Sequence, residues 1–330
     1  MQNNELPNTK DQKLKTAVIG VGSLGQHHAR NYAELAKEGI GEFVGVCDVN
    51  EENARTIAEK NGCNYFTDWR ELLDKVTAVS IVTPTETHCE IACAFLEKGV
   101  NVLVEKPFAL TLAEADLMIE AAEKSGAKLM VGHLERFNPA MVALRPQVDN
   151  PLYFEIHRVS PFPNRSLDVD VVLDVMIHDL DAIQWLVDSE VSEIRAVGIP
   201  VISDKVDAAN ARIEFANGAV ANITASRIGT EKIRKTRFYQ TNSYVVLDYG
   251  TKFASVTSLA PNAIHPLLGI SINRLEIEDI EPLRAEISAF LNCIIEDKTP
   301  PITAADGRRA LKLALGVLEK IEAHRNLLNV

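Results

Sequence analysis

AVIGVGSLGQHHARNYAELAK, residues 17–37, decides the fold, because an apolar run meets a glycine-rich turn that leads into a helical pattern. Gly20 permits a tight turn, Gly22 lets the backbone approach a pyrophosphate, and Gly25 lets the helix pack closely on the strand. The unsatisfied amides at the start of that helix would then face phosphate groups. We therefore expect a nucleotide here, bound by Gly20, Gly22, Ser23, Leu24 and Gly25.

The second strand of this pattern, residues 43–47, ends in Asp48. A carboxylate about twenty residues after the glycines can accept hydrogen bonds from both hydroxyls of an adenosine ribose. It would also repel a 2′-phosphate, and no arginine directly follows it. The sequence therefore favours NAD over NADP as the cofactor, while a helix cap remains the other interpretation of Asp48.

Apolar runs and helical patterns alternate from this point to about residue 131. Continuous apolar strands imply a parallel sheet that is covered on both faces. Residues 14–137 are therefore predicted to form an α/β Rossmann domain with a doubly wound parallel sheet. Residues 1–13 are polar, lack a signal-peptide core and are expected to be a disordered tail. The predicted strands are residues 78–82, 101–104 and 128–131, and the predicted helices are residues 51–61, 68–73, 86–98 and 112–124.

Ligands of doubly wound sheets lie beyond the carboxyl ends of the strands, where polar residues follow three predicted strands. Prolines hold the residues that precede them in extended backbone, so Thr83 and Lys106 stay outside the following helices. Lys106 is expected to point into the crevice, although a lysine at a strand end is also common on protein surfaces. The three groups are Thr83-Pro84 with His88, Glu105-Lys106-Pro107, and residues 132–139.

Past about residue 150, extended segments replace the alternating pattern, and Asn217-Gly218 is a strong hairpin signal. An antiparallel sheet is predicted, followed by two closing helices. Residues 138–330 are therefore assigned to a second, substrate-binding domain. The predicted strands are residues 153–159, 191–201, 208–215, 220–227, 233–240 and 244–247, and the predicted helices are residues 282–296 and 305–327.

Residues 171–188 carry the most informative pattern of the second half. Asp174, His178, Asp181 and Trp185 recur at i, i+4, i+7 and i+11, so a carboxylate and an imidazole share one helix face. Oxidation of an alcohol by hydride transfer needs a base for the hydroxyl proton, and histidine ionises near neutral pH. His178 is the candidate base, with Asp174 orienting it or binding substrate and Lys106 stabilising charge on the same oxygen. A solvated helix face is the alternative.

The formal net charge of -12 argues against a nucleic-acid partner or an anionic membrane surface. An anionic ligand would need local cations, and guanidinium groups suit diphosphates. Arg136, Arg158 and Arg165 cluster in sequence around the expected site. Each arginine by itself is better explained by a surface or interdomain ion pair, so only the cluster supports an anionic ligand.

Five cysteines, odd in number and without a C-x-x-C pair, indicate reduced thiols in the cytoplasm. His88, Cys89 and Cys93 could suggest a metal cluster, but we expect no metal site. No apolar run approaches the length needed to span a membrane.

Four motifs together resemble the Gfo/Idh/MocA superfamily, named for glucose-fructose oxidoreductase, inositol dehydrogenase and rhizopine catabolism. The resemblance covers nearly the whole chain. It implies a Rossmann domain and an α+β domain whose open, mostly antiparallel sheet often forms the oligomer interface, hence a homodimer or homotetramer. It also implies catalytic roles for Lys106 and His178, with Asp174 in the substrate site. The motifs are Gly20-Val-Gly-Ser-Leu-Gly25, Thr83-Pro84 with His88, Glu105-Lys106-Pro107 and Asp174-x-x-x-His178.

Residues 20–30, 131–139 and 171–181 resemble one branch, the bacterial UDP-N-acetylglucosamine 3-dehydrogenases. This branch implies oxidation of the sugar 3-hydroxyl to a ketone, which a partner aminotransferase aminates for lipid A. A dehydrogenase of a free sugar or inositol, a non-catalytic nicotinamide-sensing regulator, and glycoside cleavage through a 3-keto sugar remain alternatives. The residues expected to bind NAD are the glycine loop, Asp48, Thr83, Pro84, His88, Glu105 and Lys106. Those expected to bind substrate are Arg136, Asn138, Arg158, Arg165, Asp174 and His178.

Overall fold

The computed structural model describes residues 14–162, 169–259 and 269–328, so the predictions for residues 1–13 and for Arg165 lie outside the described residues. The chain forms two compact units. Unit 1 comprises Met1–Gly132 with Leu283–Ala305, and unit 2 comprises His133–Pro282 with Asp306–Val330. The division predicted from sequence places the boundary at residue 137 and gives residues 283–305 to the second domain, whereas this segment packs with unit 1.

Unit 1 is built on a six-stranded parallel sheet in the order β3-β2-β1-β4-β5-β6. Strand residues such as Val18, Val79 and Leu103 are completely buried, as a sheet covered on both faces requires. The predicted doubly wound sheet is confirmed. The strands are β1 (Lys15–Ile19), β2 (Glu42–Cys47), β3 (Asn64–Phe66), β4 (Ala78–Ile81), β5 (Asn101–Glu105) and β6 (Leu129–Gly132).

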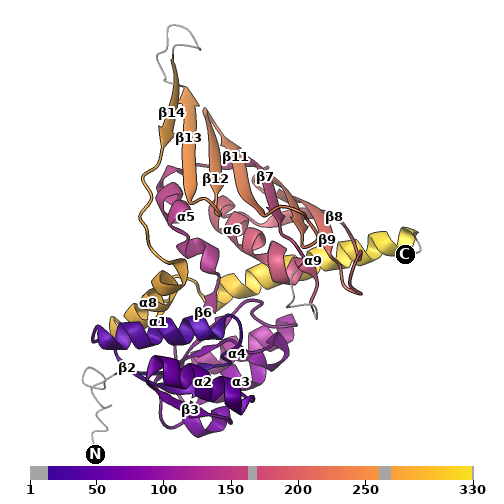
Figure 1. Cartoon of the computed structure of the whole chain (residues 1–330). Coiled ribbons are helices and arrows are strands. Elements are labelled where there is room, and N and C mark those ends of the chain that lie inside the picture. The colour runs from indigo at the N-terminus through magenta and orange to yellow at the C-terminus, as the bar shows by residue number, and fades with distance from the viewer. Residues whose placement is uncertain (1–13, 163–168, 260–268, 329–330) are drawn as a thin grey trace, which may run out of the picture. The chain divides into compact units, whose positions relative to one another are not determined.

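Helices connect these strands (Figure 1). Their ends are set by capping residues, as α4 shows. Thr111 and Glu114 form a capping box at the start of α4, and Gly126 ends that helix in the left-handed conformation with φ +74°. Right-handed crossovers run in opposite directions from β1, which places α1 and α2 on one face and α3 and α4 on the other. The helices are α1 (Gly25–Lys37), α2 (Glu51–Asn61), α3 (His88–Glu97) and α4 (Leu112–Ser125), with 3₁₀ turns at Trp69–Leu72 and Thr85–Thr87.

Helix α8 (Pro282–Ile295) returns from the C-terminal half of the chain to complete unit 1. Arg284 of α8 donates hydrogen bonds to Glu34 at 3.3 Å and to Glu38 at 2.6 Å, both on α1. Ile287 and Phe290 are completely buried. The first unit therefore depends on a segment that lies about 150 residues further along the chain than β6.

Unit 2 is built on an eight-stranded sheet in the order β14-β13-β12-β11-β7-β10-β9-β8. All neighbouring strands are antiparallel except β7 and β10, so the prediction of a mostly antiparallel sheet is confirmed. The Asn217-Gly218 turn joins β9 to β10 with Gly218 at φ +88°. The strands are β7 (Pro151–Val159), β8 (Val191–Ile199), β9 (Ala208–Phe215), β10 (Val220–Ser226), β11 (Ile233–Gln240), β12 (Ser243–Asp248), β13 (Phe253–Leu259) and β14 (Ile270–Arg274).

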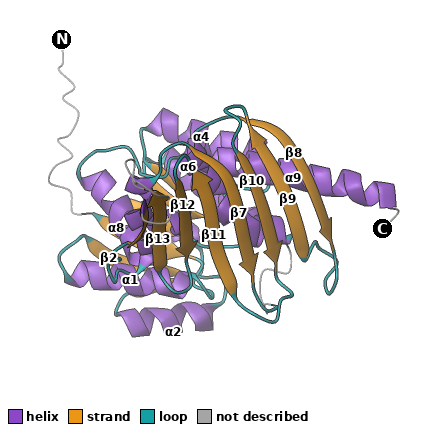
Figure 2. Ribbon diagram, turned by 90° about the horizontal axis from the view of Figure 1, so that it is seen from above, coloured by secondary structure: helices purple, strands orange, loops and turns teal. Residues whose placement is uncertain are grey.

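One face of this sheet is covered by helices. On β7, Phe154 and Ile156 are buried on the covered face, while Glu155 and His157 alternate with them on the other face. Figure 2 shows the strands in front of α9 (Ala304–Leu328). Helix α9 packs tightly on β8, because a methyl group on Gly198 would lie 2.9 Å from the Ile321 side chain. The other helices of this unit are α5 (Pro139–Leu144) and α6 (Ile177–Val187).

Two buried ion pairs hold helix α6. Arg158 of β7 donates to both carboxylate oxygens of Asp179 at 2.8 Å and to Glu135 at 2.7 Å. Arg136 donates to both oxygens of Asp181 at 2.8 and 2.6 Å. Each arginine is less than a tenth exposed. Bidentate pairs of this kind are directional, so they fix the rotation of α6 about its axis as well as its distance from the sheet.

A third buried pair holds the segment that leads into α6. Arg227 and Asp207 are completely buried and paired at 2.9 Å, and Asp207 also accepts hydrogen bonds from three backbone amides between residues 201 and 203. Arg227 donates in addition to the carbonyl of Val169 at 2.8 Å. The chain that leads into the predicted catalytic segment is therefore held in place by the Arg227–Asp207 pair.

Replacing Arg158 with methionine should lower the free energy of unfolding by about 3–5 kcal/mol, because Asp179 and Glu135 would remain buried without their cation. Arg195→Met is the control, since Arg195 lies in a well-exposed pair with Glu193 and should change stability by less than about 1 kcal/mol. Urea unfolding measures both. The double variant with Asp179→Leu should recover part of the loss. Equal effects of the two single variants would contradict this account.

Candidate active site

The glycine loop of unit 1 has the shape that a pyrophosphate requires. Gly20 has φ +84°, and a side chain there would lie 2.7 Å from the carbonyl oxygen of Val82. Gly22 is exposed and has open space where its side chain would be. In the described part of the chain, no side chain caps the first turn of α1, so its amides can face a phosphate. The loop therefore fits the phosphates of a dinucleotide.

Asp48 is held rigidly at the end of β2, beside this loop. One carboxylate oxygen accepts hydrogen bonds from the amide of Val21 at 2.9 Å and from the Asn53 side chain at 3.1 Å. The other accepts from the amide of Asn50 at 2.9 Å. Asn50, not Asp48, is the N-cap of α2. The half-buried carboxylate keeps one acceptor site, on the oxygen bound to Asn50, for a ribose hydroxyl.

Asn53 is a candidate that the sequence interpretation missed. Its side chain also donates to the carbonyl of Val21 at 3.1 Å, so it ties Asp48 to the glycine loop. The available signal was its place in the first turn of α2, five residues after Asp48. An asparagine there is ordinary, and only the folded chain shows what its amide group contacts.

His88 joins two of the loops at the carboxyl edge of the sheet. Its ring nitrogens lie 3.1 Å from the carbonyl oxygen of Pro107 and 2.9 Å from that of Thr83. Burial lowers the pKa of His88, and a neutral ring can donate to one of these carbonyls at a time. The side chain is 1% exposed, so we revise its predicted role to support of the Thr83 and Pro107 loops. Thr83 is half-buried and Pro84 is exposed at the same edge.

Lys106 is half-buried directly after β5, as predicted. Glu105, which precedes it, is only 6% exposed and points inward. The Glu105 carboxylate lies 3.0 Å from Nε2 of His28 and accepts a hydrogen bond from the amide of Lys106 at 3.2 Å. Its contacts are therefore with the chain beneath the loop, and we revise its predicted role from cofactor contact to support of Lys106.

Asp174 and His178 lie in unit 2 at a change of helix type. Val172–Met176 forms a π-helical turn, and α6 begins at the next residue. Both side chains are half-buried, whereas Asp179 and Asp181 point into the interior. Isolated π turns of this kind are frequent at functional sites. The helix face predicted from regular spacing thus contains a partly accessible pair, Asp174 and His178, while the buried aspartates anchor the helix.

Three residues predicted to bind substrate have structural partners instead. Arg136 and Arg158 are buried with their guanidinium groups directed at carboxylates, so they do not present a cationic cluster to a diphosphate. Asn138 is 7% exposed and is the N-cap of α5, where it accepts a hydrogen bond from the amide of Ala140. Buried charges and helix ends need partners within the chain, so these contacts account for the three side chains, and their binding of substrate stays a prediction.

Arg234 is a cation that the sequence interpretation missed. It lies opposite Arg158 in the pairing of β11 with β7 and alternates onto the same face as the buried Thr236 and Phe238. Unlike Arg158, it is half-buried, and its charge acts on Asp179. The strand alternation was visible in the sequence, but the covered face could not be identified without the sheet order.

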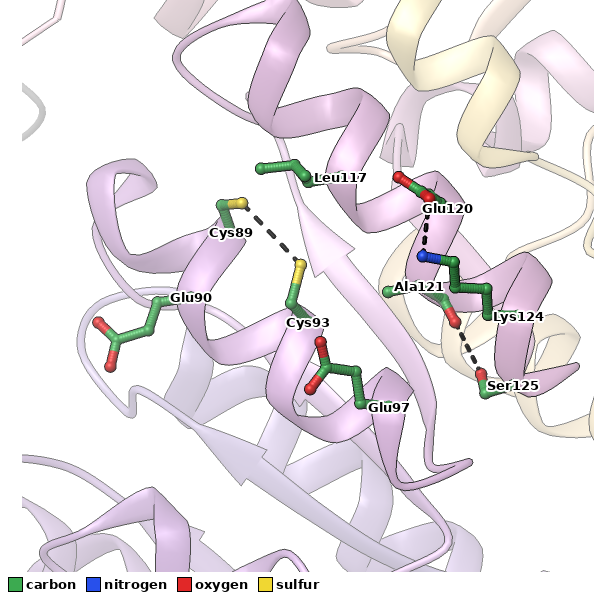
Figure 3. Close-up of a pocket in the computed structure, with 9 residues that line it drawn as sticks. All are labelled: Cys89, Glu90, Cys93, Glu97, Leu117, Glu120, Ala121, Lys124 and Ser125. Carbon is green, nitrogen blue, oxygen red and sulfur yellow. Dashed lines mark hydrogen bonds and ion pairs between the residues drawn. The ribbon is translucent and has the colours of Figure 1, made fainter.

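The Cys89 and Cys93 thiols lie 4.0 Å apart on α3, beside a pocket of about 460 Å³ between α3 and α4 (Figure 3). Burial raises the pKa of Cys93 to about 12. The other lining residues are polar or aliphatic, and none is a predicted site residue. Within residues 14–162, 169–259 and 269–328, no three histidine, cysteine or acidic side chains are arranged to hold a metal ion. No helix in these ranges has the length and apolar character of a membrane span.

Both units match known families. Residues 14–133 match the model of the oxidoreductase family with an NAD-binding Rossmann fold, and residues 147–246 match the GFO/IDH/MocA C-terminal domain. The chain is 38% identical over 311 residues to the UDP-N-acetylglucosamine 3-dehydrogenase of Acidithiobacillus ferrooxidans, covering 94% of this chain and 98% of that protein. A solved structure of that dehydrogenase covers the same shares and aligns with a TM-score of 0.87.

More distant relatives share the architecture. The chain is 27% identical over 336 residues to the myo-inositol 2-dehydrogenase of Thermotoga maritima, covering 95% of this chain and 98% of that protein. A levoglucosan dehydrogenase in complex with NADH and levoglucosan has the same fold, at 24% identity and a TM-score of 0.85 over 94% of this chain and 98% of the other. Because the family matches fall in both units and a 38% identical relative is covered almost end to end, the chain belongs to the Gfo/Idh/MocA family of NAD-binding oxidoreductases.

Proposed function

We propose that this chain uses NAD to oxidise a ring hydroxyl of a nucleotide sugar, with the 3-hydroxyl of UDP-N-acetylglucosamine as the preferred target. The observation that carries this proposal is the 38% identity to a UDP-N-acetylglucosamine 3-dehydrogenase across 94% of the chain. The inositol dehydrogenases that match are less similar, at 27% identity for the Thermotoga maritima enzyme. The presence of Lys106, Asp174 and His178 disfavours a non-catalytic regulator of the same fold.

Three side chains would share the chemistry. Bound NAD supplies a hydride acceptor for the carbon that carries the hydroxyl. Neutral His178 accepts the hydroxyl proton, and Asp174, one turn earlier, orients the imidazole or holds a neighbouring sugar hydroxyl. Lys106 donates a hydrogen bond to the reacting oxygen and stabilises its developing negative charge. The alcohol would thus lose its hydroxyl proton to the histidine and the hydride on its carbon to the bound nicotinamide, which leaves a ketone.

His178→Asn and Lys106→Met should each lower kcat by about 10²- to 10⁴-fold, the range typical of general acid–base groups. NAD affinity and unfolding temperature should stay near the wild-type values. His157→Asn, on the uncovered face of the sheet, and Lys98→Met, in an exposed pair with Asp74, are the matched controls. Near-native turnover by either test variant would remove that residue from the mechanism.

Asp48→Ala should weaken NAD binding by about 10- to 100-fold, the value of one or two hydrogen bonds to a charged group, and should narrow the preference over NADP. Asn53→Ala should also weaken NAD binding and narrow the preference over NADP, because Asp48 would lose its side-chain anchor. Asn61→Ala is the control, because the Asn61 amide group donates to the carbonyl of Ile57 within α2. Titration of each variant with both dinucleotides gives the answer. Equal or tighter binding of NADP by the wild-type protein would contradict the assignment.

Arg234 is our candidate for the diphosphate. Its charge lies on the covered face of the sheet, next to the pair that anchors the helix of His178. A local cation is needed, because the net charge of -12 would otherwise repel an anionic substrate.

UDP-N-acetylglucosamine should therefore be oxidised much more efficiently than N-acetylglucosamine or myo-inositol. Arg234→Ala should raise KM for the UDP-sugar by about tenfold or more, the value of one charge-assisted hydrogen bond. Arg237→Ala, on the opposite face of the same strand, is the control. The assay should include a glutamate-dependent aminotransferase to consume the ketone, since oxidation of a secondary alcohol by NAD is unfavourable near neutral pH. Comparable turnover of the free sugar or inositol would establish the polyol dehydrogenase alternative. Release of a cleaved glycoside would establish the alternative of glycoside cleavage through a 3-keto sugar.

A homodimer or homotetramer remains part of this proposal. The uncovered face of the unit 2 sheet supports it, because Tyr153, Tyr239 and Tyr244 form a continuous ring cluster there with centroids 5.7 and 4.9 Å apart. Tyr239 is 41% exposed. Exposed aromatic clusters of this kind are typical of protein interfaces.

A further inference from the structure

Lys106 lies between two residues that are contacted by buried histidines from different helices. Glu105, directly before it, lies against His28 of α1, with 3.0 Å between Oε1 of the acid and Nε2 of the ring. Pro107, directly after it, has its carbonyl oxygen 3.1 Å from Nδ1 of His88 on α3. The two histidines are 0% and 1% exposed. Helices from opposite faces of the sheet thus hold the two neighbours of one half-buried lysine.

The Glu105 carboxylate connects His28 to the lysine itself. Its second oxygen, Oε2, accepts a hydrogen bond from the amide of Lys106 at 3.2 Å. Gly132 lies opposite Glu105 in the pairing of β5 with β6, and a methyl group there would lie 2.9 Å from the carboxyl carbon. The carboxylate is therefore enclosed between a helix and a neighbouring strand, and its orientation sets the position of the Lys106 amide.

The His28 ring is the donor in its contact with Glu105. Hydrogen bonds from His28 and from the amide of Lys106, together with the charge of Lys106, keep the pKa of Glu105 below its usual value although burial raises it. An ionised carboxylate can only accept, so Nε2 of the ring carries a hydrogen. Nδ1 has no hydrogen-bond partner among the described residues, and a hydrogen there would be buried without an acceptor. A neutral ring with its hydrogen on Nε2 satisfies both conditions.

We propose that His28 is a positioning residue for Lys106: its imidazole holds the Glu105 carboxylate in the orientation that accepts the Lys106 amide, and so aligns the lysine with helix α1. The inference rests on the catalytic role proposed above for Lys106. His28 lies three residues after Gly25, in the first turn of the helix that follows the glycine loop. One side chain therefore connects the segment that would receive the pyrophosphate with the group that would contact the reacting oxygen.

Stability alone does not require the polar contact between His28 and Glu105. Two buried polar partners can generally be replaced by apolar residues of similar volume without loss of stability. Catalysis does require a defined lysine, because a misplacement of about 1 Å can lower a rate about 100-fold. Stability and turnover should therefore respond differently when both partners are made apolar.

His28→Leu should lower kcat by about 10- to 100-fold, because Glu105 loses the donor that orients it. The unfolding temperature should also fall, since the carboxylate stays buried with one partner fewer. His28→Gln keeps an N–H donor near the position of Nε2 and should recover most of the rate. NAD affinity should stay near the wild-type value in both variants, because the glycine loop precedes His28.

Tyr32→Phe is the matched control on the same helix. Tyr32 is buried and its hydroxyl lies 2.8 Å from that of Ser80 on β4, so this variant also removes a buried hydrogen bond between α1 and the sheet. It should lower the unfolding temperature and leave kcat unchanged, because the contact does not lead to Lys106.

The double variant His28→Leu/Glu105→Met separates the two possible roles of the contact. It should regain stability relative to His28→Leu, because the carboxylate that lost its donor is also removed. Its kcat should stay low, since the amide of Lys106 has lost its acceptor. Recovery of stability and turnover together would show that the pair is structural and would overturn the inference. If His28→Leu does not fold, this double variant gives the same decision.

Two NMR measurements test the contacts without substrate. The nitrogen shifts of the His28 ring should show a hydrogen on Nε2 and none on Nδ1. Hydrogen exchange at the amide of Lys106 should be faster in His28→Leu than in the wild type. His28→Gln should restore the protection of this amide, and Tyr32→Phe should leave it unchanged.

These results distinguish the positioning role from the proposed function. Near-native turnover by Lys106→Met would contradict the catalytic role of the lysine. Wild-type kcat and wild-type exchange of the Lys106 amide in His28→Leu would overturn the positioning role, while the proposed function would stand. An equal loss of turnover in Tyr32→Phe would overturn it too, because any buried hydrogen bond of α1 would then have the same effect.

Discussion

The buried ion pair of Arg158 with Asp179 and Glu135 is the interaction on which the placement of His178 depends. Asp179 follows His178 directly in α6, so a helix held through the aspartate presents the histidine at a constant angle. Rotation of α6 would leave charges buried without partners, and that cost far exceeds the energy of an ordinary surface contact. The need to pair buried charges thereby fixes the orientation of α6. The arginine that fixes it belongs to strand β7 of the sheet and not to the site itself.

The same rule operates throughout a chain that carries a net charge of -12. Arg136, Arg158 and Arg227 are each buried with bound carboxylates, so the buried acids described in unit 2 have arginine partners, and Arg158 serves two of them. Arginine suits this use because its planar group makes two parallel hydrogen bonds to one carboxylate. Arg234, which we propose as the cation for an anionic substrate, is instead partly accessible.

Unit 1 satisfies its acids by different means. Asp48 is held by two backbone amides and an asparagine, which leaves it partly accessible at the glycine loop. Glu105 is held by a histidine and an amide, beneath the lysine that follows it. The difference follows from location, because Asp48 lies beside the glycine loop, whereas Glu105 lies beneath the loop that carries Lys106. Each arrangement fixes the backbone at the end of a parallel strand, where doubly wound sheets bind their ligands.

The sequence alone determined the features that depend on neighbours along the chain. The glycine loop, the apolar strands of unit 1, the boundaries of α2 and the Asn217-Gly218 hairpin follow from local backbone preferences and short periodicities. The family and its Lys106, Asp174 and His178 were recognisable for the same reason, since they lie in short motifs.

Only the tertiary structure decided which polar residues face the site. Arg136 and Arg158 pair with carboxylates that lie 45 and 21 residues away in the sequence. No local pattern distinguishes a buried guanidinium group from an accessible one. Strand β14 is exposed along its whole length, so no buried face marks it as part of the sheet. The return of α8 to unit 1 depends on packing between distant segments, and the free energy of that packing is not encoded in any single stretch of the chain.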